Sequence, residues 1–165
     1  MIQLLAQLYT IHSETGHEWP MISFVREYVS KHIPEASVRL DKLGNLYITK
    51  GKAGVGYPTL ACHLDQVQKL HSEDFEVREE NGTLYGGSEQ TQRREGLGAD
   101  DKNGIWVCLR CLEECPRLKV LMAVGEPIRK AINNGVREWL YNRSNGVLLV
   151  VQFNSKGKVS KAGGR

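Results

Sequence analysis

The chain has 165 residues, of which 41% are hydrophobic and 25% are charged, with a formal net charge of +3. This length suits one domain, and the composition is that of a globular protein rather than of a disordered or fibrous one. No apolar run approaches the ~20 residues that a membrane helix needs, and the N-terminus lacks the features of a secretory signal. We therefore expect a cytoplasmic protein with no membrane partner.

The first third of the sequence predicts two helices followed by a hairpin. Apolar residues recur at helical spacing over residues 1–11 and 22–32. Residues 37–50 alternate apolar and polar side chains around the turn Gly44-Asn45, which is typical of a β-hairpin.

The sequence up to residue 126 then alternates strands with a helix. Residues 59–64 and 118–124 are short apolar runs typical of buried strands. Residues 75–85 predict a second hairpin, and residues 103–114 predict a helix. This order favours an α/β fold in which helices flank a mixed β-sheet.

The four cysteines are Cys62, Cys108, Cys111 and Cys115. The last three lie close together in sequence, which does not suit a disulfide framework. Cys108 and Cys111 form a C-x-x-C pair, so a zinc or redox site is an alternative. No second pair of ligands follows, however, and the segment has helical periodicity. We expect unpaired thiols, the last three on a buried helix face.

The first candidate site motif is His63-Leu64-Asp65, at the end of an apolar run. On an extended chain, residues i and i+2 point to the same side. The imidazole and the carboxylate are therefore presented together at a strand end, where open α/β sheets bind ligands. A metal-bound imidazole needs an acceptor for its other N–H group, and Asp65 can supply it. By itself the motif is common and does not establish a site.

The second motif runs from Gly96 to Gly104 and holds Asp100 and Asp101 side by side ahead of a helix. One aspartate in that place can cap the helix by accepting backbone N–H groups. A second carboxylate beside it is costly unless cations neutralise the pair, as when a carboxylate bridges two metal ions. The motif is therefore compatible both with a helix cap and with a metal site.

The two motifs and their spacing resemble the peptidase-T-like branch of the two-zinc aminopeptidases and carboxypeptidases. The resemblance rests on the blocks HLD, GLGADDKNGI and VLMAVGE, on Ser13, Gly16 and Glu18, and on D-x-x-G-N at 41–45. It covers about residues 4–126. It implies the mixed, helix-flanked sheet of zinc exopeptidases (a phosphorylase/hydrolase-like fold), here incomplete.

The resemblance also implies roles for individual residues. His63 would ligate one zinc ion, and Asp65 would orient its imidazole. Asp100 would bridge two zinc ions, with the peptide bond to Asp101 in the cis form. Glu126 would be the general base that takes a proton from the metal-bridging water. The substrates would be short peptides.

The match ends at Glu126. In the family a second glutamate follows, as a ligand of the other zinc ion, whereas this chain has Pro127. The chain also contains no histidine after His71, and the inserted lid or dimerisation domain of the family is missing. Because several ligands are lacking, we expect the chain to bind zinc poorly and to be inactive alone.

The sequence after the match has a different charge. Residues 127–165 carry 8 basic residues and 1 acidic residue, whereas residues 1–126 carry 14 and 18. We expect a partial di-zinc catalytic domain at 1–126 and a divergent basic segment at 127–165, with a helix near 128–141, a strand near 147–153 and a disordered end. A frameshift, a splice variant, recombination or genuine divergence would each explain the change.

Two functional hypotheses follow. The first is a truncated or degenerate metallopeptidase, similar to tripeptide aminopeptidases that hydrolyse short peptides through a zinc-bridged water. A homo-oligomer is expected with it, and the alternative within the same chemistry is an active hydrolase whose missing ligands are supplied by another chain. The second is a non-catalytic module whose basic tail contacts nucleic acid or another anion. The tail has few aromatic residues and no nucleic-acid motif, which favours the first hypothesis.

Overall fold

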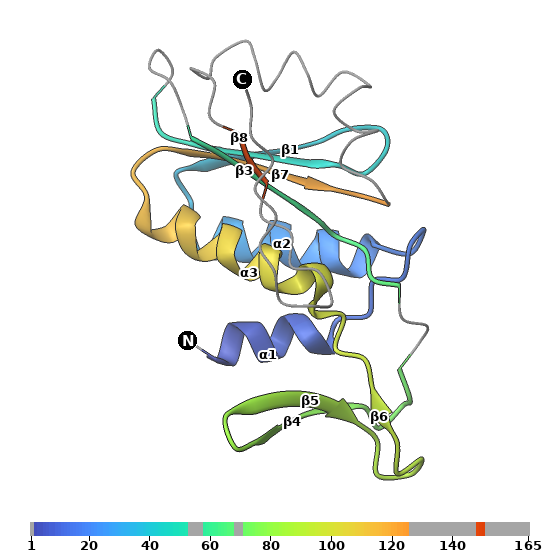
Figure 1. Ribbon diagram of the computed structural model, residues 1–165. Coiled ribbons are helices and arrows are strands. Elements are labelled where there is room, and N and C mark those ends of the chain that lie inside the picture. The colour runs from blue at the N-terminus through green and yellow to red at the C-terminus, as the bar shows by residue number, and fades with distance from the viewer. Residues whose placement is uncertain (1, 53–57, 68–70, 126–147, 151–165) are drawn as a thin grey trace.

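A computed structural model describes residues 2–52, 58–67, 71–125 and 148–150 of the chain (Figure 1). The helices in this part are α1 (Ile2–Thr10), α2 (Trp19–His32) and α3 (Ala99–Glu114). The strands are β1 (Ala36–Leu40), β2 (Leu46–Lys50), β3 (Thr59–His63), β4 (Glu76–Glu80), β5 (Thr83–Gly87), β6 (Arg94–Glu95), β7 (Leu118–Ala123) and β8 (Leu148–Val150). Within these residues no helix is long and apolar enough to cross a membrane.

The main sheet has five strands in the order β1-β2-β7-β3-β8. The pairs β1–β2 and β2–β7 are antiparallel, whereas β3 runs parallel to both β7 and β8. Helices α2 and α3 lie along one face of this sheet (Figure 1). A small antiparallel sheet of β4, β5 and β6 lies on the far side of α1 from the main sheet. The expected α/β fold with a mixed sheet and flanking helices is confirmed.

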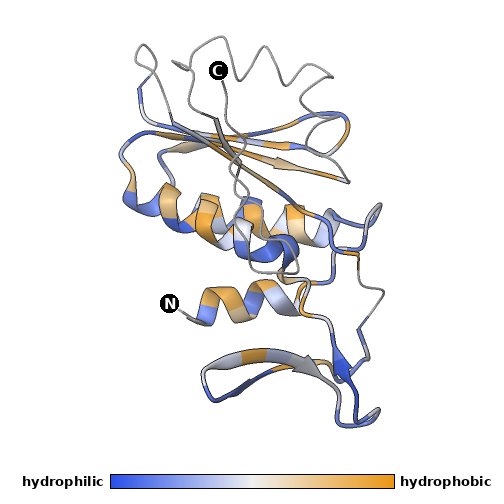
Figure 2. Ribbon diagram, viewed as in Figure 1, coloured by the Kyte–Doolittle hydropathy of each residue, from blue (hydrophilic) through white to orange (hydrophobic). Residues whose placement is uncertain are grey.

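The core lies between the main sheet and the helices. Every residue of β3 and of β7 is buried, as expected for central strands with parallel neighbours. Helix α2 buries residues that recur every three or four positions, namely Met21, Ile22, Val25 and Val29. Figure 2 shows apolar residues along the strands of the main sheet and on α2 and α3. Burial of each large apolar side chain stabilises the fold by about 1.5–3 kcal/mol.

Both predicted hairpins are present, and their turns have the expected glycine chemistry. In the first, β1 pairs with β2 across a turn in which Gly44 has φ +96°. In the second, β4 pairs with β5 across Asn81 and Gly82, which have φ 51° and 75°. Positive φ at both central residues is the conformation that Asn-Gly favours in a two-residue hairpin.

Two helices begin earlier than the periodicity predicts. Helix α2 starts at Trp19 rather than at residue 22, with Pro20 in its first turn. Proline fits there because its missing N–H group has no partner within the helix. Helix α3 starts at Ala99 rather than at residue 103, although Asp100 and Asp101 have non-helical φ and ψ angles. Apolar spacing at buried positions does not detect the exposed Trp19 and Pro20 or the polar first turn of α3.

Two of the four cysteines belong to the core and two pack against it, with Cys115 just after the end of α3 rather than on a buried helix face as expected. Cys62 and Cys108 are buried, Cys111 and Cys115 are half-buried, and all four are free thiols. Burial raises the pKa of the Cys62 thiol, and the neighbouring Cys108 raises it further. A thiol with a raised pKa is a poor nucleophile, so Cys62 acts as a small apolar side chain.

Several expectations fall on residues outside those that the structure describes. These are the general base Glu126, the helix near 128–141 and the disordered basic end. Of the strand expected near 147–153, residues Leu148–Val150 are described as β8. This strand pairs with β3, so part of the basic segment belongs to the main sheet.

Lys50, at the end of β2, is a buried charged residue that the alternating pattern does not single out. Its Nζ donates hydrogen bonds to the carbonyl oxygens of Leu112 (2.7 Å) and Glu113 (3.2 Å) and lies 3.0 Å from a Glu35 carboxylate oxygen. The last carbonyl groups of a helix have no partner within the helix. Lys50 therefore caps α3 from the neighbouring strand.

We expect Lys50→Met to lower the free energy of unfolding by about 1.5–3 kcal/mol, the usual contribution of hydrogen bonds to a charged group. Methionine keeps the apolar stem but leaves the two carbonyl groups without their donor. Urea unfolding followed by circular dichroism measures the change. The matched control is Lys42→Met at an exposed lysine, which should stay within about 0.5 kcal/mol of the original chain. Equal losses in both variants would contradict the capping role.

Candidate metal site

The candidate site lies at the carboxyl ends of two parallel strands. The register of β3 and β7 places His63 opposite Ala123, and the backbone N–H of Leu64 donates to the carbonyl oxygen of Ala123 at 2.8 Å. Both strands therefore end at the same edge of the sheet. In open α/β sheets this edge is where ligands bind.

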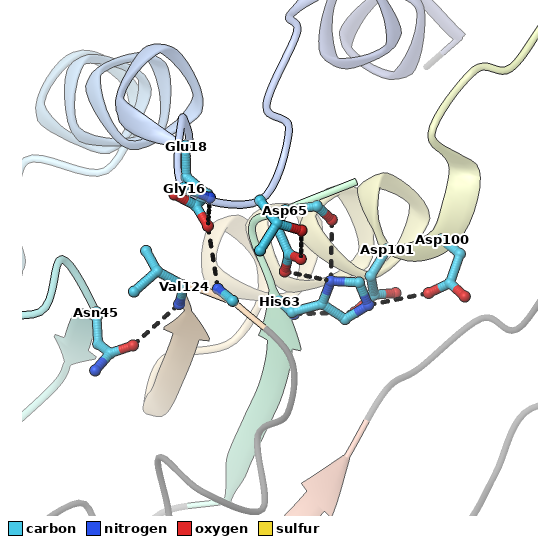
Figure 3. A network of polar contacts seen from close by, with 10 residues as sticks. Gly16, Glu18, Asn45, His63, Asp65, Asp100, Asp101 and Val124 are labelled. Carbon is cyan, nitrogen blue, oxygen red and sulfur yellow. Dashed lines mark hydrogen bonds and ion pairs between the residues drawn. The ribbon is translucent and has the colours of Figure 1, made fainter. Parts of the chain in front are cut away.

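The imidazole of His63 lies between two aspartates (Figure 3). Its Nδ1 is 3.0 Å from the backbone carbonyl oxygen of Asp65 and 3.1 Å from Asp65 Oδ1. Its Nε2 is 3.0 Å from Asp100 Oδ1. The structure thus brings together three of the four residues that the sequence singles out, and the fourth, Glu126, lies outside the described residues.

The charges around His63 change its protonation. Burial lowers the pKa of His63, but the hydrogen bond with Asp65, the charges of Asp101 and Asp65 and the hydrogen bond with Asp100 raise it to about 9. Burial raises the pKa of Asp65, yet hydrogen bonds from His63 and Thr15 bring it below its ordinary value. At neutral pH the metal-free site therefore holds an imidazolium ion between carboxylates.

The two adjacent aspartates of the second motif have different environments. The Asp100 side chain is 39% exposed and faces His63 Nε2. Asp101 is fully buried, and its Oδ2 accepts the backbone N–H of His63 at 3.2 Å. The peptide bond between them is cis, as the resemblance implies. The residue at the N-cap of α3 is Gly98, not an aspartate.

Sequence reasoning missed the part that Asp101 plays, because it treated the two carboxylates as partners in one cluster. Asp101 instead holds the backbone at the end of β3, directly under the imidazole. Gly104, on the next turn of α3, makes room for it: a Cβ at Gly104 would lie 2.5 Å from Asp101 Oδ2. Gly104, four residues after Asp100, is the sequence feature that could have indicated this role of Asp101.

The next two residues of the motif attach α1 to α3. Lys102 Nζ donates to the carbonyl oxygen of Tyr9 at 3.2 Å, and the Tyr9 hydroxyl donates to Asn103 Oδ1 at 2.5 Å. Lys102 is only 1% exposed, and burial lowers the pKa of its ammonium group to about 7. Lysine is rarely buried to this extent, so hydropathy patterns do not predict this contact.

The end of β7 is held by two side chains from elsewhere in the chain (Figure 3). Asn45 Oδ1 accepts the backbone N–H of Val124 at 3.0 Å. Glu18 Oε1 accepts the backbone N–H groups of Gly16 (3.0 Å) and Gly125 (3.2 Å). The resemblance singled out Glu18 and the D-x-x-G-N motif without a role, and the structure shows that they fix the strand end.

The first residue of the D-x-x-G-N motif organises the hairpin turn. Asp41 accepts hydrogen bonds from the backbone N–H groups of Leu43 and Asn45, the Asn45 side-chain amide and the Tyr47 hydroxyl. Burial raises the pKa of Asp41, but these hydrogen bonds bring it below its ordinary value. The turn therefore presents Asn45 to β7 in a fixed orientation.

The chemistry of these donors fits a divalent metal in part. His63 Nε2 and Asp100 Oδ1 face one another, and an imidazole with a carboxylate is a ligand combination that suits zinc. The acceptors on Nδ1 are those of a metal-binding histidine. In the described part of the chain, however, no three His, Cys, Asp or Glu side chains converge to hold a metal ion. Among the described residues, His63 and Asp100 are thus two facing side chains of a ligand type that suits zinc.

Comparison with known proteins finds the same fold in peptidases. The chain matches no protein-family model and no curated protein. A tripeptidase from Staphylococcus aureus superposes with a TM-score of 0.66 and 21% identity over 92% of this chain and 42% of its own. Aminopeptidase PepT from Bacillus cereus superposes with a TM-score of 0.63 and 20% identity, over 92% of this chain and 42% of PepT. The TET1 peptidase of Pyrococcus horikoshii superposes with a TM-score of 0.55 and 12% identity, over 92% of this chain and 68% of its own. That peptidase can assemble into a tetrahedron or a large octahedral shell.

These likenesses establish the fold. The chain has the fold of part of these peptidases, which confirms at the level of architecture the resemblance that the sequence motifs indicate. It spans 42% of the length of the tripeptidase and of PepT, so it corresponds to less than half of either protein.

Stability should fall as His63 loses its proton. The folded pKa of about 9 lies above the ordinary value of 6.5, so the imidazolium contribution is complete below about pH 6.5 and disappears as the pH rises through about 9. The difference in unfolding free energy between the metal-free chain and His63→Gln should therefore shrink across this interval. Taking the difference removes the opposite trend of Lys102. Urea unfolding with a chelator measures it, and a constant difference would contradict the charged imidazole.

We expect Gly104→Ala to destabilise the chain by about 1–3 kcal/mol, as overpacked sites do, despite the ~1 kcal/mol that alanine normally gains over glycine in a helix. The added methyl group would displace Asp101. The control is Gly87→Ala, where the new Cβ would lie 3.6 Å from a carbonyl oxygen of Arg93, an ordinary contact. Thermal unfolding compares the two, and a Gly104→Ala chain at least as stable as the control would show that Asp101 needs no such space.

Proposed function

We propose that the chain forms part of a metal-dependent peptidase site in which His63 and Asp100 bind zinc and Asp65 orients the imidazole. The observation that supports this most directly is the position of His63, which has a carboxylate at each ring nitrogen and lies at the carboxyl edge of the sheet. A histidine that served only to pack the core would not need a partly exposed carboxylate at Nε2.

Each residue has a defined task in this proposal. Asp65 and its own carbonyl group accept the Nδ1 proton, which leaves the Nε2 lone pair for the metal. Asp100 would supply a carboxylate oxygen as the second ligand, next to His63 Nε2. A bound zinc ion supplies Lewis acidity that polarises a peptide carbonyl and activates water. Glu126 is the proposed general base, and the hydrogen bond from Gly125 to Glu18 fixes the backbone just before it.

The substrate class that we propose is short peptides. The support comes from the fold, because the structural neighbours include a tripeptidase and an aminopeptidase. A homo-oligomer in the cytoplasm is part of the same proposal, since one neighbour with this fold assembles into shells.

We also propose that residues 1–126 are a partial catalytic domain, that residues 127–165 are a divergent basic segment, and that the chain does not turn over peptides by itself. Two sequence features support the lack of turnover: Pro127 replaces the expected second glutamate, and no histidine follows His71. The two proposed ligands among the described residues, His63 and Asp100, are fewer than the three that a catalytic zinc ion normally has. Zinc binding to this chain is therefore weak.

Isothermal titration of the purified full chain with zinc chloride tests the proposal. We expect weak binding that releases protons, because the metal replaces the proton on Nε2. His63→Ala should abolish this binding. The matched control is His32→Ala, an exposed histidine at the opposite end of α2 from the site, which should bind zinc as the original chain does. Binding that persists unchanged in His63→Ala would rule out the proposed site.

The same samples test turnover. We expect no hydrolysis of a tripeptide with added zinc, manganese or cobalt. Metal-dependent hydrolysis that His63→Ala removes would show that the chain is active alone, and that residues outside the described part or a second copy complete the ligand set.

A further inference from the structure

The loop between α1 and α2 crosses the site and contacts both strand ends. The carbonyl oxygen of Ser13 accepts the backbone N–H of Gln66 at 2.8 Å, and Glu14 forms a parallel β-bridge with Gln66. At its other end, the Glu18 carboxylate accepts the N–H of Gly125 beyond β7. The loop therefore joins the carboxyl ends of β3 and β7.

Thr15, in the middle of this loop, reaches the site with its side chain. Its hydroxyl donates to Asp65 Oδ2 at 2.7 Å, whereas Asp65 Oδ1 lies 3.1 Å from His63 Nδ1. Asp65 is only 3% exposed, so water does not readily replace either donor. Each oxygen of the buried carboxylate thus has its own hydrogen-bond donor.

Two donors at fixed positions restrict a carboxylate that otherwise rotates about its Cβ–Cγ bond. With Oδ2 on Thr15, Oδ1 is directed at Nδ1, and that nitrogen keeps its proton. Nε2 is then the nitrogen left to face Asp100. Without the hydroxyl, the carbonyl oxygen of Asp65, 3.0 Å from Nδ1, is the remaining fixed acceptor.

From this arrangement we infer that Thr15 is a positioning residue of the candidate site, which acts on His63 through Asp65 and thereby tunes its affinity for a divalent cation. The inference rests on the proposed function for the identity of the cation. Thr15 does not touch the imidazole and takes no part in proton transfer. Its hydroxyl orients the Asp65 carboxylate, which in turn orients the His63 imidazole.

The test compares Thr15→Val with Thr15→Ser in the full chain. Valine keeps the β-branched shape without the hydroxyl, and serine keeps the hydroxyl without the methyl group. We expect valine to raise the zinc dissociation constant by up to about 10-fold, the lower end of the effect of losing a metal ligand's own hydrogen-bond partner, because Thr15 acts one hydrogen bond further from the metal. Serine should restore the original affinity. Thr10→Val, whose hydroxyl donates to the Gln7 carbonyl oxygen at the end of α1, should leave affinity unchanged.

A second readout needs no metal. In the zinc-free chain, the NMR signal of the His63 Nδ1 proton reports its hydrogen bond to Asp65. We expect that proton to exchange faster with water in Thr15→Val than in the original chain, and at the original rate in Thr15→Ser. Urea unfolding checks that the variants are folded, and Thr15→Ala replaces Thr15→Val if the valine chain is not.

The outcomes separate the two proposals. Absence of His63-dependent zinc binding in the original chain, together with the expected change in proton exchange, refutes the metal site and supports the role of Thr15. If Thr15→Val binds zinc with the affinity of the original chain and its His63 Nδ1 proton exchanges at the original rate, the inference is overturned. The backbone carbonyl oxygen of Asp65 would then be enough to orient the imidazole. Failure of serine to restore either property also overturns it, since shape rather than the hydroxyl would be responsible.

Discussion

The parallel pairing of β3 with β7 is the constraint on which the rest of the site depends. It aligns His63 with Ala123, so that the segments after both strands leave the sheet at one edge. A slip of one residue would turn His63 toward the opposite face, because side chains alternate along a strand. Every residue of both strands is buried, so the register is specified by how the side chains of each face fit their neighbours in a closely packed core. Core packing thus determines where the imidazole lies.

The imidazole in turn organises the charges around it. Two aspartates contact its ring nitrogens and a third accepts a hydrogen bond from its backbone, so acidic side chains gather at this edge of the sheet. A proton or a metal ion on Nε2 neutralises part of that charge, and the two compete for the same nitrogen. This edge of the sheet therefore favours a cation over an anion.

Sequence periodicity predicted the hairpins and the buried strands, because these depend on alternation within short segments, whereas a shared site for His63 and Asp100 was implied by the family resemblance. Periodicity did not predict contacts between distant segments. Glu18 and Asn45 hold the end of β7, and Lys102 holds α1, through hydrogen bonds that no local pattern encodes. Asp101 was considered only as the second carboxylate beside Asp100 and received no role of its own, whereas non-helical φ and ψ angles at both residues let the two side chains take different places.

The place of β8 in the sheet has a consequence for synthesis on the ribosome. Strand β3 ends at His63, but its outer neighbour begins at Leu148, so β3 emerges long before that partner exists. Until then its apolar edge has unpaired backbone groups, which is the condition under which strands pair with other chains. Parallel pairing between distant segments is also slow. The nascent chain therefore passes through a stage in which chaperones that shield apolar strand edges would favour correct folding over aggregation.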